Sequence, residues 1–337
     1  MKNINIGIIG YGYWGPNLVR NFMNQANGVV LKVADGRNER LALLNKTYPS
    51  IKTCADATEL ISDPLIDAVV IATPVFTHFE LAKKALLAGK HALLEKPMTS
   101  SVEEAEELIN IADKNGLVLM VDHTFLYTGA VQKIKELIDN NTIGTIRYFD
   151  SSRINLGLFQ PDVNVLWDLA PHDISILIYL INNEPCSINA TGISHTQNHI
   201  ENIAYMTVNY QSDFIAHFSC SWTSPVKVRQ TLIGGDKKMV VFNDLEPSEK
   251  VRIYDTGFNH KTEEDKNTIM VDYRTGDVFI PKLSSHEALK EVASDFIGSI
   301  IENKTPLSNA QLGMKVVRIL EASQKSIKNN GKEIKIN

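Results

Sequence analysis

Hydrophobic and polar positions follow two different patterns along the chain. From residue 4 to about residue 122, short apolar runs rich in Val, Ile and Leu alternate with longer amphipathic stretches. The short runs predict strands, and the stretches with an apolar residue every three or four positions predict helices. Strands that alternate with helices of this length indicate a parallel, doubly wound sheet. Ligands of such sheets bind at the carboxyl ends of the strands.

The elements of this first region can be read from the sequence in order. The predicted strands are INIGIIG, VVLKVAD, DAVVIATP, HALLEKP and LVLMVD. The predicted helices between them are GPNLVRNFMN, RNERLALLNKTYP, THFELAKKALLAGK and SVEEAEELINIADKNG. Serine followed by glutamates begins the last of these helices, and Gly with a nearby Lys ends the last two, as is typical of helix boundaries.

After residue 122 the pattern changes to one dominated by strands. An extended segment and an amphipathic helix over 123–140 precede a predicted strand, GTIRYFDSSRIN, and a helix within APHDISILIYLIN. The runs that follow, separated by turn signals, predict a large and mostly antiparallel sheet; they are SINATGISH, NIAYMTVNY, DFIAHFSCSW, KVRQTLIGG, KMVVFND, KVRIYD and TIMVDY. Residues 255–284 are polar and predict a long excursion, and two helical patterns close the chain.

These patterns predict two domains with different folds. We expect an α/β domain with a parallel sheet over residues 1–122, and an α+β domain with an open, mostly antiparallel sheet over residues 123–337. An open sheet with one apolar face left over needs a partner, so we expect a homodimer or homotetramer in which the second domain also serves oligomerisation.

Composition narrows the classes of function. The 337 residues are 44% hydrophobic and 22% charged, with a net charge of -5, which argues against a nucleic-acid partner. No run approaches the roughly 18 apolar residues of a membrane helix, so we expect no membrane association. The cysteines are few, odd in number and widely spaced, which predicts reduced thiols, no metal site and a cytoplasmic location; they are Cys54, Cys186 and Cys220.

The first predicted strand leads into a full G-x-G-x-x-G motif. Gly10, Gly12 and Gly15 flank Tyr11, Tyr13 and Trp14, a helix pattern follows, and Asp35 lies twenty residues later at the end of the second strand. This context predicts a dinucleotide site, with the pyrophosphate at the helix N-terminus and Asp35 on the adenosine ribose. The charge of Asp35 favours NAD over NADP, although the guanidinium of Arg37 would suit a 2′-phosphate.

Two further predicted strands end at the same edge of the sheet in residues that could bind a cofactor or take part in a reaction. IATPVFTH places Ala72, Thr73 and Pro74 there, followed by His78, for which a capping role and a cofactor contact are both open. HALLEKP places Glu95 and Lys96 there. A buried strand has no use for an unpaired ammonium, so Lys96 is predicted to lie where the nicotinamide end of a cofactor would be.

One stretch of the second region, NVLWDLAPHDIS, also contains several polar residues that could act in catalysis. Asp168 and His172 are four residues apart and would share one face of a helix. Pro171 predicts that the helix begins near that proline, with His172 in its first turn. There the helix dipole would favour a neutral imidazole, which suits a proton acceptor.

Together these motifs resemble the Gfo/Idh/MocA family of sugar and polyol dehydrogenases over essentially the whole chain. The motifs are GYGYWG (10–15), ATP (72–74), EKP (95–97) and the D-x-x-x-H of DLAPH (168–172). The resemblance implies a Rossmann domain, a lysine beside the nicotinamide, and an Asp and a His that contact substrate hydroxyls. The flanking words SSRINLGLF and NVLWDLAPHDISIL look most like members that act on nucleotide-linked sugars in surface-polysaccharide pathways.

The expected reaction is hydride transfer between a secondary alcohol of a sugar and the nicotinamide. His172 is the first candidate for general base, Lys96 would hydrogen-bond the reacting oxygen, and Asp168 would orient His172 or a second hydroxyl. A buried lysine beside a cationic nicotinamide would also serve as base, so this choice stays open. Glu95 is expected to support Lys96 or the nicotinamide ribose. Further candidate substrate ligands are Tyr127, Arg153, Asn155 and Arg229, the two arginines as a clamp for a diphosphate.

Three other functions remain compatible with the same residues. The first is an inositol or free-sugar dehydrogenase of the same family. The second is a dinucleotide-sensing regulator without catalysis, which would not need Lys96, Asp168 and His172 together. The third is a dehydratase or hydrolase that oxidises its substrate transiently and returns the hydride.

Overall fold

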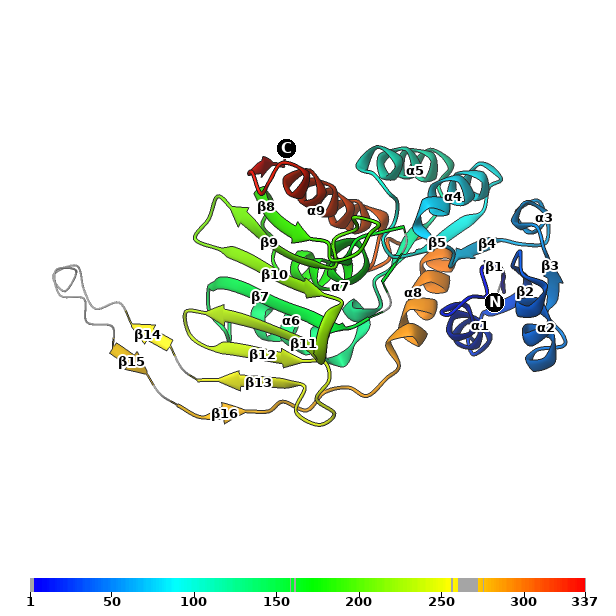
Figure 1. The fold of residues 1–337 in the computed structure, drawn as a ribbon. Coiled ribbons are helices and arrows are strands. Elements are labelled where there is room, and N and C mark those ends of the chain that lie inside the picture. Colours follow the sequence, from blue (N-terminus) through cyan, green and yellow to red (C-terminus); the bar gives the residue numbers. More distant parts are fainter. Residues whose placement is uncertain are drawn as a thin grey trace. The chain divides into compact units, whose positions relative to one another are not determined.

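The chain folds as two compact units that are drawn in Figure 1. The computed structural model describes residues 3–157, 159–160, 162–255, 257–259, 272–274 and 276–336. The first unit comprises Met1–Thr128 and His286–Arg318, and the second comprises Gly129–Ser285 and Ile319–Asn337. This division differs from the predicted boundary at residue 122, because helix α8 (Ala288–Glu302) packs against α1 (Gly15–Met23) although it is far away in sequence.

The first unit is built on a six-stranded sheet in the order β3-β2-β1-β4-β5-β6. Every neighbouring pair is parallel, which confirms the predicted doubly wound sheet. The strands β1 and β4 lie at its centre and are almost entirely buried. The strand bounds are β1 Ile4–Ile9, β2 Gly28–Ala34, β3 Lys52–Cys54, β4 Ala68–Ile71, β5 His91–Glu95 and β6 Leu119–Asp122.

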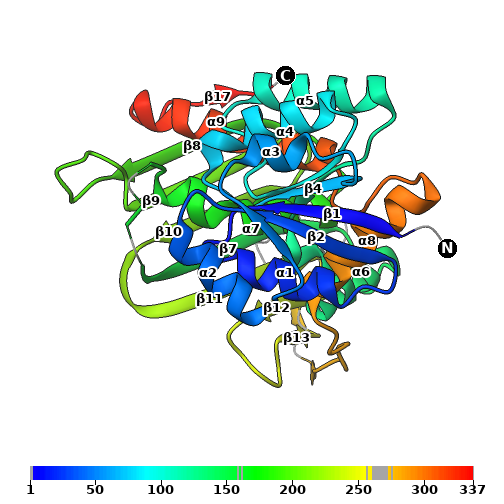
Figure 2. The ribbon, with the colours of Figure 1, turned by 90° about the vertical axis from the view of Figure 1, so that its right-hand side faces the viewer.

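Helices cover both faces of this sheet. Figure 2 shows α1 and α2 (Asn38–Thr47) on one face, and α3 (Ala57–Ile61), α4 (His78–Leu87) and α5 (Val102–Asn115) on the other. The predicted ends of α5 are confirmed, since the Ser101 side chain accepts the N–H of Glu104 and Gly116 adopts a left-handed conformation with φ 63°. Short helices at Val75–Thr77 (η1) and Thr124–Tyr127 (η2) follow β4 and β6.

Distant residues close the outer edge of β6. Met120 forms an isolated bridge with Asn309, and the backbone N–H of Val121 donates to the carbonyl of Ser308 at 3.0 Å. The segment between α8 and α9 (Ala310–Lys328) thus covers an edge that would otherwise expose unpaired backbone groups.

The second unit is built on a nine-stranded sheet in the order β16-β13-β12-β11-β7-β10-β9-β8-β17. Only β7 and β10 pair in parallel within this sheet as described, so the prediction of a mostly antiparallel sheet is confirmed. The bounds are β7 Ile146–Leu156, β8 Pro185–Ile193, β9 Ile203–Tyr210, β10 Ile215–Ser221, β11 Thr223–Gly235, β12 Met239–Asn243, β13 Val251–Tyr254, β16 Val278–Phe279 and β17 Ile334–Lys335.

A separate two-stranded sheet lies within the predicted excursion. It pairs β14 (Gly257–Asn259) with β15 (Asp272–Arg274). The predicted strand TIMVDY overlaps β15 only at its last two residues, and its first four residues lie outside the described ones.

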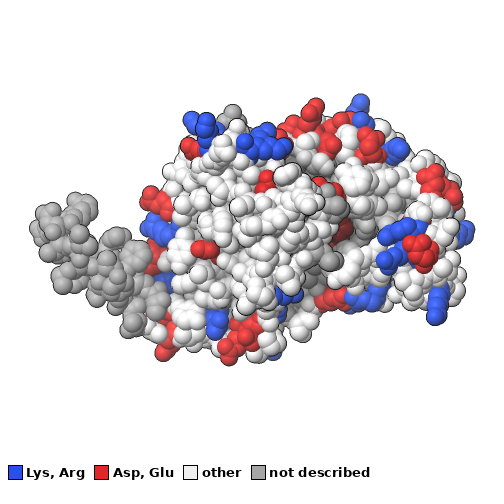
Figure 3. Space-filling view, viewed as in Figure 1, with Lys and Arg blue, Asp and Glu red and all other residues white. Residues whose placement is uncertain are grey.

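One face of the nine-stranded sheet carries helices and the other is open. The helix α7 (Val165–Leu180) contacts β7, β9 and β10, and α6 (Gly129–Asp139) packs on α7. Residues that alternate with the buried ones, such as Tyr205 and Ile215, are about half exposed on the open face. Figure 3 shows few charged side chains over strands β7 to β11.

The predicted start of α7 near Pro171 is wrong. The helix begins at Val165, because the Asn164 side chain accepts the N–H groups of Leu166 and Trp167 and caps it. Pro171 therefore lies inside the helix, and His172 lies beyond the first turn rather than in it. Asp168 and His172 do lie one helical turn apart, as their spacing predicts.

No helix in the described part of the chain combines the length and apolar character that crossing a membrane requires.

Candidate active site

The glycine-rich turn joins β1 to α1 at the carboxyl edge of the six-stranded sheet. Gly10 has φ 98°, and a Cβ atom there would lie 2.4 Å from the carbonyl oxygen of Ala72. A Cβ atom on Gly15 would lie 2.5 Å from the carbonyl oxygen of Gly10. Backbone segments therefore approach each other too closely for side chains at these two positions.

The start of α1 has room for a ligand phosphate. A Cβ atom on Gly12 would have only the Arg37 guanidinium nearby, at 3.4 Å, and Tyr13 is 93% exposed. Trp14 precedes the helix and makes no side-chain cap, so it leaves the first N–H groups uncovered by its own side chain. The N–H groups of Asn17 and Leu18 donate to the Trp14 carbonyl, at 2.9 and 3.3 Å, and Pro16 has none. The N–H groups of the glycine-rich turn before the helix, together with the helix dipole, would therefore favour an anion such as a dinucleotide pyrophosphate.

Asp35 lies just after β2 and is held by four hydrogen bonds. Its carboxylate accepts the backbone N–H of Tyr11 at 2.7 Å and the backbone N–H of Arg37 at 2.9 Å. The Arg37 guanidinium adds two bonds of 2.9 Å, one to each oxygen. Burial alone would raise the pKa of Asp35, but these bonds lower it below its ordinary value. The carboxylate is ionised and partly covered by an arginine that is half exposed.

His78 connects two of the predicted cofactor motifs. Its ring is buried, with Nδ1 3.0 Å from the carbonyl oxygen of Pro97 and Nε2 2.8 Å from that of Thr73. Burial lowers the pKa of His78 although these carbonyls raise it, so the ring is neutral and donates to one of the two. The ATP loop, Ala72 to Pro74, and the EKP loop are thereby tied together. A direct cofactor contact of His78 stays a prediction.

Glu95 and Lys96 end β5 as predicted, and β6 adds a partner that the sequence did not indicate. Asp122 pairs directly with Glu95 in the register of the two strands. The Asp122 carboxylate accepts the Thr124 hydroxyl at 2.5 Å and the Trp14 indole N–H at 3.4 Å. The backbone N–H of Lys96 donates to Glu95 Oε2 at 3.3 Å.

Burial and mutual repulsion perturb this group of acids. Burial first, and then the charge of Asp122, raise the pKa of Glu95 well above its ordinary value. His123, which follows Asp122 in the chain, is fully buried, and neither of its ring nitrogens has a hydrogen-bond partner among the described residues. Burial and the charge of Lys96 lower the pKa of His123 to about 3, so its ring is neutral. Asp122 and His123 belong to none of the motifs. The sequence signal for them is their position at the end of the predicted strand LVLMVD.

Tyr127, a predicted substrate ligand, lies within the first unit and is buried. Its hydroxyl donates to Asp295 at 2.7 Å and accepts the backbone N–H of Ser308 at 3.2 Å. Burial and the neighbouring Asp295 raise the pKa of Tyr127 above its ordinary value. These contacts hold η2 against α8 and the segment after it. A contact of Tyr127 with substrate stays a prediction.

The second unit holds the predicted Asp and His on α7. Both side chains are half-buried, and Asp168 Oδ2 accepts the indole N–H of Trp222 at 3.0 Å. The tryptophan itself is buried at the end of β10, which fixes the direction of the carboxylate. The same face of α7 therefore presents an oriented carboxylate and, one turn later, an imidazole.

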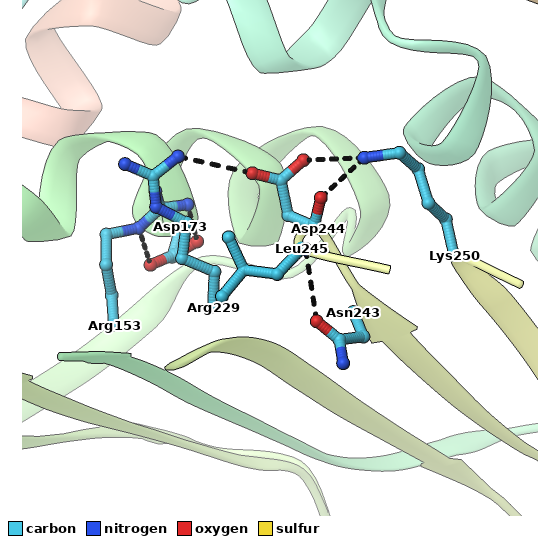
Figure 4. Close-up of polar contacts among 7 residues, drawn as sticks. All are labelled: Arg153, Asp173, Arg229, Asn243, Asp244, Leu245 and Lys250. Atoms are coloured by element: carbon cyan, nitrogen blue, oxygen red, sulfur yellow. Dashed lines mark hydrogen bonds and ion pairs between the residues drawn. The ribbon is translucent and has the colours of Figure 1, made fainter. Parts of the chain in front are cut away.

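The two predicted arginines lie opposite each other on β7 and β11. Figure 4 shows that each bonds an acid of its own unit. Arg153 is buried and donates two bonds of 2.8 Å to Asp173 on α7. Arg229 donates to Asp244 at 3.3 Å, and Asp244 also accepts the Lys250 ammonium.

The remaining predicted ligand, Asn155, is half-buried two residues after Arg153 on β7. Contacts of Asn155 and of the two arginines with a diphosphate or sugar stay predictions.

The parallel sheet, the glycine-rich turn and the acid at the end of β2 define a dinucleotide-binding protein of the Rossmann class. Residues 4–123 match the oxidoreductase family with an NAD-binding Rossmann fold, and residues 131–241 match the GFO/IDH/MocA C-terminal domain. The chain belongs to the Gfo/Idh/MocA family of oxidoreductases, as its motifs indicated.

Two curated relatives have named activities. UDP-N-acetylglucosamine 3-dehydrogenase of Acidithiobacillus ferrooxidans is 33% identical over 216 residues, which is 62% of this chain and 64% of the relative. The NADP-linked scyllo-inositol 2-dehydrogenase IolW of Bacillus subtilis is 26% identical over 225 residues, 62% of this chain and 61% of the relative. The matched stretches thus span less than two thirds of these relatives.

Solved structures match over a longer part of the chain. An oxidoreductase from Magnetospirillum magnetotacticum MS-1 is 27% identical with a TM-score of 0.81, covering 95% of this chain and 99% of that one. The structure of the Acidithiobacillus dehydrogenase has a TM-score of 0.80 at 23% identity, covering 98% and 100%, and shares the fold.

Proposed function

We propose that this protein is a nicotinamide-dependent dehydrogenase that transfers a hydride between a secondary alcohol of a sugar and the cofactor. The observation that carries the proposal is Lys96 at the carboxyl end of β5, on the sheet edge that also bears the glycine-rich turn. An ammonium at this edge suits an oxygen that gains negative charge during the reaction. Bound nicotinamide would supply the hydride chemistry.

The remaining steps belong to side chains of the protein. His172 accepts the hydroxyl proton, and Asp168, oriented by Trp222, directs the imidazole or a second hydroxyl. Lys96 hydrogen-bonds the reacting oxygen. In the reverse direction the same groups return the proton to the alkoxide. Lys96 in place of His172 as the base is the alternative assignment, and each such group typically contributes on the order of 10² to 10⁴ in rate.

NAD is the proposed cofactor, with NADP second. The N–H groups of the turn would hold the pyrophosphate, and Asp35 would accept the ribose hydroxyls. Asp35→Ala should weaken NAD binding and improve the relative use of NADP, because it removes the acceptor and the charge that repels a 2′-phosphate. Binding titrations with both cofactors measure this, and an unchanged preference would contradict the assignment of Asp35.

The proposed substrate is a sugar linked to a nucleotide. The flanking sequence and the similarity to an enzyme named UDP-N-acetylglucosamine 3-dehydrogenase support it. The similarity to an inositol dehydrogenase keeps inositols and free sugars as the second candidate. We also propose a cytoplasmic location, and a homodimer or homotetramer formed through the open face of the nine-stranded sheet, where Tyr205 and Ile215 are exposed.

Cofactor reduction tests the proposal directly. Purified protein and NAD or NADP would be offered UDP-N-acetylhexosamines, their uronic acids, other nucleotide sugars, inositols and free sugars. Reduction with a nucleotide sugar supports the proposed substrate, whereas reduction with inositol or a free sugar alone replaces it. If NAD binds but no substrate leads to its reduction, or to the oxidation of NADH, the proposal of a dehydrogenase is rejected. A regulator, or an enzyme with a transient redox cycle, is then the better interpretation.

A lysine variant tests the catalytic assignment. Lys96→Met should reduce turnover by at least about 10²-fold while the Kd for NAD changes only a few fold, because the lysine acts on the reacting oxygen. Lys84→Met, at an exposed position of α4 in the same unit, is the matched control. Equal activity of the two variants would remove Lys96 from the mechanism.

A further inference from the structure

Two carboxyl groups lie side by side next to Lys96. Glu95 and Asp122 are direct partners in neighbouring parallel strands, so their side chains lie on the same face, on strands about 4.8 Å apart. This pairing places the charge of Asp122 beside Glu95, where it raises the pKa of the Glu95 carboxyl. Asp122 is buried, and the Oε1 atom of Glu95 is inaccessible to solvent although the rest of Glu95 is half-buried.

Three of the four carboxyl oxygens of Glu95 and Asp122 accept a hydrogen bond from a neighbouring N–H or O–H group. Asp122 Oδ1 accepts from the Thr124 hydroxyl, Asp122 Oδ2 from the Trp14 indole, and Glu95 Oε2 from the backbone N–H of Lys96. Glu95 Oε1 faces no donor among the described residues. A proton on Glu95 that is donated to Asp122 would satisfy both groups and remove the repulsion of two adjacent buried charges.

The titratable groups around the pair supply one positive charge. Lys96 acts on both acids with a positive charge. His123 is neutral, since burial and Lys96 lower its pKa to about 3. Tyr127 lies within electrostatic range of Asp122, but its pKa is raised, so it is also neutral. A single cation balances a single negative charge, not two.

We propose that Glu95 and Asp122 share one proton and together present one negative charge that positions Lys96 for the reaction. This inference rests on the proposed function for its kinetic consequence, not for the shared proton itself. Loss of the proton at alkaline pH would place a second negative charge beside the oxygen that becomes alkoxide-like. The rate should therefore fall at alkaline pH because the pair loses its proton.

Infrared spectroscopy of the protein without cofactor or substrate tests the shared proton. Near neutral pH the parent protein should show the carbonyl band of a protonated carboxylic acid, and Glu95→Gln and Asp122→Asn should each lack it. Glu103→Gln, an exposed position on α5, should retain the band as the matched control. A parent protein without the band, or a band that persists in Glu95→Gln, overturns the proposal.

Kinetics with the identified substrate test the positioning role. The alkaline decline of kcat in the parent should be absent in Glu95→Gln, whose amide mimics the protonated acid. The double variant Glu95→Gln/Asp122→Asn removes the negative charge and should lower kcat by on the order of 10²-fold with a smaller change in KM. An unchanged alkaline decline in Glu95→Gln contradicts the role. Failure to find any substrate would reject the proposed function but leave the infrared result decisive.

Discussion

The two units bury charged side chains in different ways. In the nine-stranded sheet, Arg153 and Asp173 neutralise each other through two bonds of 2.8 Å, and both side chains are 4% exposed. In the six-stranded sheet, Glu95 and Asp122 are two acids that need a proton between them. A buried charge is tolerated when an opposite charge or a proton compensates it. The first solution is insensitive to pH, whereas the second titrates.

Their surroundings explain this difference. Burial alone would lower the pKa of Arg153, but Asp173 raises it above its ordinary value, so the guanidinium stays charged at any working pH. Burial and the charge of Asp122 raise the pKa of Glu95 well above its ordinary value, so this carboxyl holds a proton more readily than an exposed one. The second unit thus has a fixed structural pair, while the first has a pair whose charge can respond to the reaction.

The largest effect is expected when the fixed pair is broken. Arg153→Met leaves Asp173 buried without its partner and should lower the free energy of unfolding by about 3 to 5 kcal/mol. Urea unfolding followed by circular dichroism measures this loss. Arg153→Met/Asp173→Leu removes both charges and should recover much of the stability. If the double variant is no more stable than the single one, the loss comes from packing and not from charge.

Glu95→Gln should sharpen the comparison through the pH dependence of stability. The pKa of Glu95 is raised in the folded protein. Glu95 therefore contributes fully to the free energy of unfolding below its pKa in the unfolded chain, about 4.3, and this contribution is lost as the pH rises toward the pKa in the folded protein. The stability of the variant should therefore increase relative to the parent above that pH, by about 1.4 kcal/mol for each unit of raised pKa.

Urea midpoints of the parent and of Glu95→Gln over a pH series measure this difference. Glu103→Gln, at an exposed position of α5, is the matched control. A flat difference for Glu95→Gln would mean that the acid is ionised in the folded protein.

Tyr127→Phe tests a third arrangement, in which a buried neutral hydroxyl donates to a half-buried acid, Asp295. The variant leaves the Ser308 N–H without its acceptor and Asp295 with one donor fewer, and should destabilise the protein by about 1 to 3 kcal/mol. Thermal unfolding measures the loss, and KM for the identified substrate tests the predicted binding role. A raised KM without a loss of stability would favour substrate contact over the structural role.

Much of the fold could be predicted because short apolar runs and longer amphipathic stretches alternate regularly along the chain. The strand β3 and the helix α3 were not predicted, since they contain only three and five residues and depend on their neighbours. The preference of proline for a first helical turn misplaces the start of α7, because the helix is capped by Asn164 and Pro171 lies inside it. Two local signals conflict there, and the hydrogen bonds from Leu166 and Trp167 to the Asn164 side chain fix the start of the helix.

Residues of the candidate site could be found where topology alone locates them. Asp35 and Lys96 directly follow strands of a parallel sheet, and the carboxyl ends of these strands lie at one edge. Asp122 was missed because its relation to Glu95 depends on the register of β5 and β6, which no local pattern specifies. The partner of Arg153 was missed for the same reason, since it lies on a helix packed over the sheet.

The smallest effect on stability is expected at the pair formed by the half-exposed Arg37 and the buried Asp35. Arg37 is half exposed, so solvent screens its attraction, and Arg37→Ala should change the free energy of unfolding by less than about 1 kcal/mol. Its effect on cofactor choice should be larger, because removing the guanidinium frees the oxygens of Asp35 for ribose hydroxyls and removes a cation that suits a 2′-phosphate. The ratio of Kd values for NADP and NAD should therefore rise, and Arg40→Ala, at a partly exposed arginine on α2, should leave it unchanged. A ratio that falls would mean that Arg37 supports NAD by holding Asp35 in place.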